Sequence, residues 1–209
     1  MTPISHFESI WERCEELSAM HAFLAGRLTA ALKPDEILRA EWVSRVSALD
    51  LYIHEVVAQR MLEIFDGART PSAGYLRFQV PNDTLIRIRT APTPTDASQA
   101  FDLEVRSRLG FSTFQDPEKI ADGIRLVSNI ELWNELALHQ GATAANKQTQ
   151  AKLLKRALSI IVERRNKIAH EGDLMPSHPR TPWPISTADL LEVKSVISNI
   201  VTSIDAVLP

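Results

Sequence analysis

The sequence predicts an all-α protein, folded as a helical bundle with a proline-rich loop before its last helix. The first observation behind this prediction is that apolar residues recur at three- and four-residue steps in segments throughout the chain. The second is that helix-start and helix-stop residues, mainly Asp, Ser, Pro and Gly, stand between these segments. With 209 residues, 44% apolar and 23% charged, the chain is long enough to bury a core, and we expect a single domain over residues 1–209.

Two long helices are expected in the first third of the chain. An apolar face recurs from Phe7 to Leu24, and Lys33-Pro34 ends this first helical region. Pro34 suits the first turn of the next helix because two acidic residues follow it and favour a helix N-terminus. This second helix should run to Phe65, with Gly67 as its stop.

The middle of the chain is less regular. Residues 67–97 hold four prolines and two glycines, and we expect a long loop or an insertion there. Within it, the brief alternation of residues 84–89 is compatible with a short strand. Helical spacing resumes over 97–109, and Asp116-Pro117 begins a helical region that extends to Ala137.

The last third predicts two more helices. One spans about Asn146 to His170 and ends near Gly172, which suits a helix C-terminus. Four prolines follow within residues 176–184. Ser186, with Asp189 three residues later, then resembles a capping box at the start of the final helix.

Composition excludes several classes of protein. The single cysteine, Cys14, rules out an intramolecular disulfide framework and is expected to be a buried core thiol. The sequence shows no glycine-rich phosphate loop and no His, Cys or carboxylate set with zinc spacing, so we expect neither a cofactor nor a metal. No apolar stretch is long enough to span a membrane, and the first residues lack the basic region of a signal peptide, which favours a cytoplasmic protein.

Charge is concentrated in the penultimate helix. Residues 147–170 carry seven basic side chains and one acidic, a formal charge of +6, whereas the whole chain sums to −3. Such a segment on an acidic body suggests an anionic partner such as a phosphate backbone. A solvated helix face is the alternative explanation.

The end of this helix departs from the amphipathic pattern. At 100° per residue Arg165 lies about 40° from Ile161, inside the apolar stripe, where a charged side chain needs a partner or an interface. Asn166 and His170 are four residues apart and share one side of the helix. The alternative is a simple helix end, where basic residues and His interact favourably with the negative C-terminal end of the helix dipole.

Arg, Asn and His together suit RNA cleavage without a metal. His takes the proton of the 2′-hydroxyl near neutral pH, Arg stabilises the charge of the phosphorane, and Asn orients either group. The expected products are a 2′,3′-cyclic phosphate and a 5′-hydroxyl.

The segment also resembles a known family. Arg165-Asn166-Lys167-Ile168-Ala169-His170 is similar to the R-polar-x3-H signature of the HEPN superfamily, helical domains of which many are metal-independent ribonucleases. Its wider context resembles the RiboL-PSP branch, in the segments 45–55, 111–120 and 164–173 and at Trp133. The resemblance covers most of the chain from about residue 40, and the family fold that it implies is an antiparallel helical bundle.

The resemblance implies roles for individual residues. Arg165, Asn166 and His170 would be catalytic, and Arg164 and Lys167 would contact RNA. A further residue, Asp50, lies in an apolar stretch and is a candidate partner for a motif arginine.

The family also implies an assembly and a biological role. Its members usually dimerise, which would place two motifs in one basic cleft. The implied function is an endoribonuclease, a toxin or phage-defence effector, under the control of a regulatory partner protein. One alternative is a non-catalytic module that binds RNA or protein, and another is a purely structural helical dimer. HEPN toxins controlled by nucleotidyl-transferase antitoxins carry a tyrosine two residues after the histidine; Gly172 stands here, so that form of control is not expected.

Overall fold

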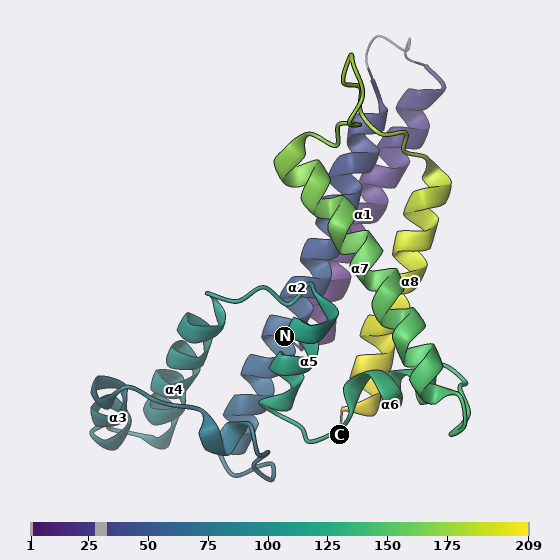
Figure 1. The fold of residues 1–209 in the computed structure, drawn as a ribbon. Helices are drawn as coiled ribbons and strands as arrows, with labels where there is room; N and C mark the ends of the chain where they lie inside the picture. Colours follow the sequence, from purple (N-terminus) through teal and green to yellow (C-terminus); the bar gives the residue numbers. More distant parts are fainter. Residues whose placement is uncertain (1, 28–32, 209) are drawn as a thin grey trace.

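The computed structural model describes residues 2–27 and 33–208, and within these ranges it is a helical bundle. Four long helices, α1 (Pro3–Ala25), α2 (Asp35–Phe65), α7 (Lys147–Glu171) and α8 (Thr187–Val207), form its body (Figure 1). The shorter α5 (Pro117–Arg125) and α6 (Leu132–His139) pack against them. Over the described ranges regular structure is helical, and the all-α prediction is confirmed.

Helix α2 is the centre of the packing. It contacts α1, α4, α5, α7 and α8, and residues along its whole length are buried. Leu49, Ile53 and Met61 are fully removed from solvent. Burial of such side chains stabilises a fold by about 1.5–3 kcal/mol each, so this helix anchors the elements around it.

The second helix begins at the expected position, whereas α1 ends at Ala25, with Gly26 as its C-cap, eight residues before the expected end at Lys33. Thr2 caps α1 by accepting a hydrogen bond from the Ser5 backbone N–H, and α2 begins one residue after Pro34. Cys14 is fully buried, as expected, and burial raises the pKa of its thiol to about 11. The expected end of the first helical region near Lys33 falls partly outside the described residues, which omit 28–32.

Residues 67–97 are more structured than predicted. They contain a 3₁₀ turn, η2 (Tyr75–Arg77), the helix α3 (Asn82–Arg89) and the start of α4 (Pro94–Leu109). The interpretation of 84–89 as a short strand was wrong. Thr84 and Ile88, four residues apart, face the body of the protein while Ile86 stays exposed, and the acidic first turn and basic last turn suit a helix.

The expected stops and caps of the last third are confirmed. Gly172 ends α7 in the left-handed conformation, with φ of 66°, and Ser186 and Asp189 form the capping box of α8. Between them the proline-rich segment folds back on itself through an antiparallel bridge between Leu174 and Pro182. Among the described residues no helix is long and apolar enough to cross a membrane.

Candidate functional site

The motif occupies the last two turns of α7, at the end of the bundle where the 173–185 segment lies beside the start of α2 (Figure 1). Asn166, Lys167 and His170 are exposed, and Arg165 is half-buried. Gly172 closes this end of α7: the Gly172 and Asp173 backbone N–H groups both donate to the Lys167 carbonyl.

The arginine reaches toward the polar side of the helix. Arg165 Nη1 donates a hydrogen bond to Asn166 Oδ1 at 3.0 Å. Asn166 and His170 share that side, one turn apart. The guanidinium thus lies near the side of α7 that carries His170, although the two backbone positions are about 140° apart on an ideal helix.

Parts of the motif lack partners. The Nε of Arg165 is buried without a hydrogen-bond partner in the described part of the chain. Within the same ranges, His170 and Lys167 make no side-chain hydrogen bond or ion pair. A buried donor without an acceptor is energetically costly, so this Nε is an unsatisfied donor within the motif.

A buried carboxylate organises the turn after the motif. Asp173 is fully buried with φ of 55°. Its carboxylate accepts from Arg39 Nε at 3.0 Å and from Arg164 Nη2 at 2.7 Å, and lies 2.7 Å from Arg164 Nε. Buried charges of this kind are stable only when paired, so two arginines from different helices hold the turn in place.

The same arginines fix the segment before α8. Arg39 Nη2 donates to the Trp183 carbonyl at 2.6 Å, and Arg164 Nη2 donates to the Pro184 carbonyl at 3.1 Å. The Trp183 N–H donates to the Asp173 carbonyl at 2.7 Å. The end of α7, the start of α2 and the proline-rich segment therefore form one unit that supports the motif.

The two residues expected to contact RNA, Arg164 and Lys167, differ in whether their side chains are already paired. The Arg164 guanidinium is committed to Asp173 and lies 5.8 Å from the Trp42 ring. Lys167 is exposed and unpaired over the described residues. Of the two, Lys167 is the cation that remains open to an anionic ligand.

Asp50 does not pair with a motif arginine, and that interpretation was wrong. It accepts hydrogen bonds from the Phe114 backbone N–H and from Gln115 Nε2, and its Oδ1 lies 3.7 Å from His54 Nε2. Its place on α2 is beside the turn that leads from α4 to α5, away from the end of α7. It supports that turn instead of the motif.

Sequence reasoning missed Arg39. This residue is 8% exposed and reaches Asp173 across 134 positions of sequence. A signal was present: Arg39 stands three residues before the buried Trp42, on the apolar side of α2, where a charge needs a partner.

Two further findings bear on the site. The described residues contain no group of three or more His, Cys, Asp or Glu placed to hold a metal ion. Comparison of the chain with protein-family models, with curated proteins and with solved structures gave no match.

Proposed function

We propose that this protein is a metal-independent endoribonuclease of the HEPN type, which cleaves RNA through attack of a 2′-hydroxyl. The observation that supports it most directly is the Arg165–Asn166 hydrogen bond beside an exposed His170. A base, a phosphate-binding cation and an orienting amide are thereby present at one helix end. These are the groups that the reaction requires.

Each residue has a distinct role in the proposed reaction. His170 removes the proton from the 2′-oxygen, which then bonds to phosphorus while the bond from phosphorus to the 5′-oxygen breaks. The leaving 5′-oxygen takes up a proton, so the products are a 2′,3′-cyclic phosphate and a 5′-hydroxyl. The Arg165 guanidinium stabilises the phosphorane oxygens, and Asn166 orients that guanidinium through the hydrogen bond that its Oδ1 accepts from Nη1.

The proposal includes a partner and a setting. Lys167 contacts the RNA backbone, and two chains pair so that two motifs share one basic cleft. The protein acts in the cytoplasm as a toxin or phage-defence effector controlled by a partner protein.

Purified protein incubated with total RNA in EDTA tests this function. We expect cleavage to persist, with products that carry 2′,3′-cyclic phosphate and 5′-hydroxyl ends. Arg165→Ala and His170→Ala should each abolish it while the thermal unfolding midpoint of His170→Ala stays unchanged, because His170 makes no side-chain contact among the described residues. Arg89→Ala is the matched control, since Arg89 is exposed on α3 and far from the motif along the chain. A strict need for added magnesium, or wild-type turnover in both motif variants, would overturn the proposal.

The second candidate is a non-catalytic module that binds RNA or protein. The observation in its favour is the surface of the α4 region, where Phe111 is 92% and Leu103 62% exposed. Binding of RNA without any cleavage product would favour this non-catalytic module.

A further inference from the structure

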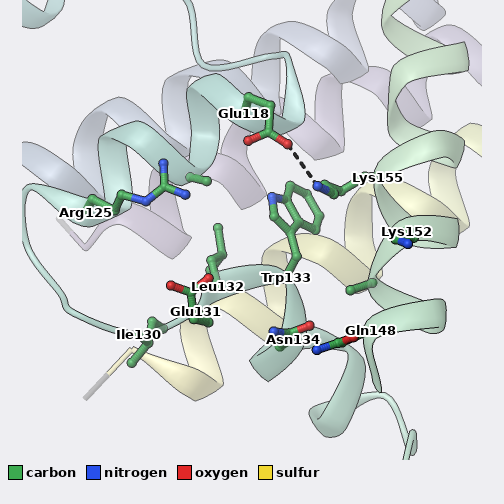
Figure 2. A pocket seen from close by; sticks show the side chains of 12 residues that line it. Glu118, Arg125, Ile130, Glu131, Leu132, Trp133, Asn134, Gln148, Lys152 and Lys155 are labelled. Carbon is green, nitrogen blue, oxygen red and sulfur yellow. Dashed lines mark hydrogen bonds and ion pairs between the residues drawn. The ribbon is translucent and has the colours of Figure 1, made fainter. Parts of the chain in front are cut away.

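A polar pocket lies between α5, α6 and the first half of α7 (Figure 2). Its volume is about 240 Å³. The α7 side contributes Gln148, Lys152 and Lys155, and α6 contributes Trp133 and Asn134 (Figure 2). Trp133 forms a fixed wall, because it is largely buried and its Nε1 donates to the Pro117 carbonyl at 3.0 Å.

Helical geometry relates this pocket to the motif. Lys152 precedes His170 by 18 residues, which is five turns, and Lys155 precedes Asn166 by 11 residues, which is close to three turns. Lys152, Lys155, Asn166 and His170 therefore lie on the same side of α7. At 1.5 Å per residue Lys152 and His170 are about 27 Å apart along the axis, roughly eight stacked nucleotides at 3.4 Å each.

The pocket contains polar groups without partners. Lys155 is neutralised by Glu118, at 2.9 Å (Figure 2). The Arg125 guanidinium at the far wall pairs with Asp122. In contrast, over the described ranges the side chains of Lys152, Gln148 and Asn134 make no hydrogen bond or ion pair. One free ammonium and two free amides thus meet at a single cavity.

These groups match the chemistry of one nucleotide unit. An ammonium binds a phosphate oxygen as a point charge, and an amide offers the donor and acceptor pair that base edges and ribose hydroxyls require. The acidic Glu118 and Glu131 in the same wall disfavour a ligand with several negative charges. A single phosphodiester unit fits better than a polyphosphate.

We propose that this pocket binds one nucleotide of the RNA strand, about eight nucleotides from the bond that is cleaved at the motif. Lys152 holds its phosphate, and Asn134 and Gln148 hold its base or sugar. This inference rests on the proposed function, and it adds a second point of contact that fixes where along a strand the motif acts. RNA too short to span both points is bound by the motif alone.

The test uses the full chain with His170→Ala, which leaves RNA intact during binding measurements. Fluorescence anisotropy is measured with labelled RNA of about 4 and about 12 nucleotides, over a range of salt concentrations. Adding Lys152→Ala should weaken binding of the long RNA several-fold. It should also reduce by about one the slope of the logarithm of the binding constant against the logarithm of the salt concentration. Binding of the short RNA should stay unchanged. Asn134→Ala should weaken binding of the long RNA without changing its salt dependence. Arg89→Ala should change neither the binding nor its salt dependence.

Three outcomes would overturn the inference. The first is that Lys152→Ala weakens binding of both RNA lengths equally, and the second is that it weakens binding of neither. The third is that binding of free adenosine monophosphate requires Lys152 whereas binding of the long RNA does not. Cleavage by the chain with native His170 is scored separately. If this chain does not cleave RNA, but Lys152→Ala still weakens binding of the long RNA alone, the proposed reaction is refuted and the binding site is supported.

Discussion

At the scale of single residues, the motif depends on Asp173, which no sequence pattern identified as its support. Its carboxylate is fully buried between Arg39 and Arg164. Asp173→Asn preserves the shape of the side chain and tolerates the positive φ, but removes the charge that both guanidinium groups require. We expect the free energy of unfolding to fall by about 3 kcal/mol, the low end of the range for a broken buried pair, because Arg164 is partly exposed.

Urea denaturation of the variant and the parent measures this change. Asp83→Asn provides the control, because Asp83 is 77% exposed and its only recorded ion pair, with Arg87, is at 3.6 Å. Its unfolding free energy should change by less than about 0.5 kcal/mol. Identical midpoints for Asp173→Asn and the parent would show that the buried pair contributes nothing.

Gly172 offers a second prediction at this scale, because its backbone and not its surroundings requires glycine. Its φ is 66°, and a Cβ placed there would meet Leu174 Cγ at 3.7 Å, an ordinary contact. Gly172→Ala should therefore cost about 1–2 kcal/mol from the left-handed conformation alone. Gly26→Ala is the matched control, since Gly26 has φ of −84° and open space around it. Thermal unfolding should separate the two variants, and equal midpoints would contradict this explanation.

At the scale of elements, the helices that the sequence predicted correctly are those whose signals are local. Ser186 and Asp189 cap α8, and Asp116 caps α5, through groups two or three residues away in the chain. The apolar face of α7 needed only a periodicity of 3.6. Caps and periodicity of this kind can be recognised without knowledge of any neighbour.

The elements that were missed depend on contacts far apart in the chain. Residues 84–89 are too few for periodicity to separate a strand from a helix, and the burial of Thr84 against α4, where its Oγ1 donates to Glu104, decides the matter. Arg39 meets Asp173, and Asp50 meets the turn before α5, only after folding. The motif residues were predicted as a set, but their support was not, because that support comes from α2.

The attachment of α4 to α2 should depend on pH. The hydrogen bond from Arg106 lowers the pKa of Glu55, and burial opposes this effect. A carboxyl with a lowered folded pKa stabilises the fold above its unfolded pKa, and this contribution is lost as the pH falls through the folded value. Glu55→Gln should therefore flatten the fall in stability between about pH 5 and pH 3.

Urea midpoints measured across that pH range check the prediction. Glu192→Gln serves as the control, because Glu192 is exposed on α8 and without an ion-pair partner among the described residues. A Glu55→Gln curve parallel to that of the parent would show that the Arg106 contact does not stabilise the attachment.

At the scale of the whole molecule, positive charge is concentrated along one helix, α7, and an unsatisfied donor lies near the end of that helix. The segment with a formal charge of +6, residues 147–170, lies entirely within α7, on a chain that sums to −3. At its end Arg165 keeps a buried, unpartnered Nε, and over the described residues no hydrogen bond joins it to His170. A buried donor of this kind is stabilised when a second surface supplies an acceptor.

We therefore expect a homodimer in which Arg165 of one chain acts with His170 of the other. Its two-fold axis would pass near the end of α7, and RNA between the two helices would offset the repulsion of their like charges. Light scattering at micromolar concentration should give twice the mass of the 23.4 kDa chain. Mixing Arg165→Ala with His170→Ala chains should restore about a quarter of the parent activity, because half of the dimers are mixed and each holds one intact site. Full activity in a monomer would refute the shared site, whereas a dimer with no recovery on mixing would place Arg165 and His170 of each site in the same chain.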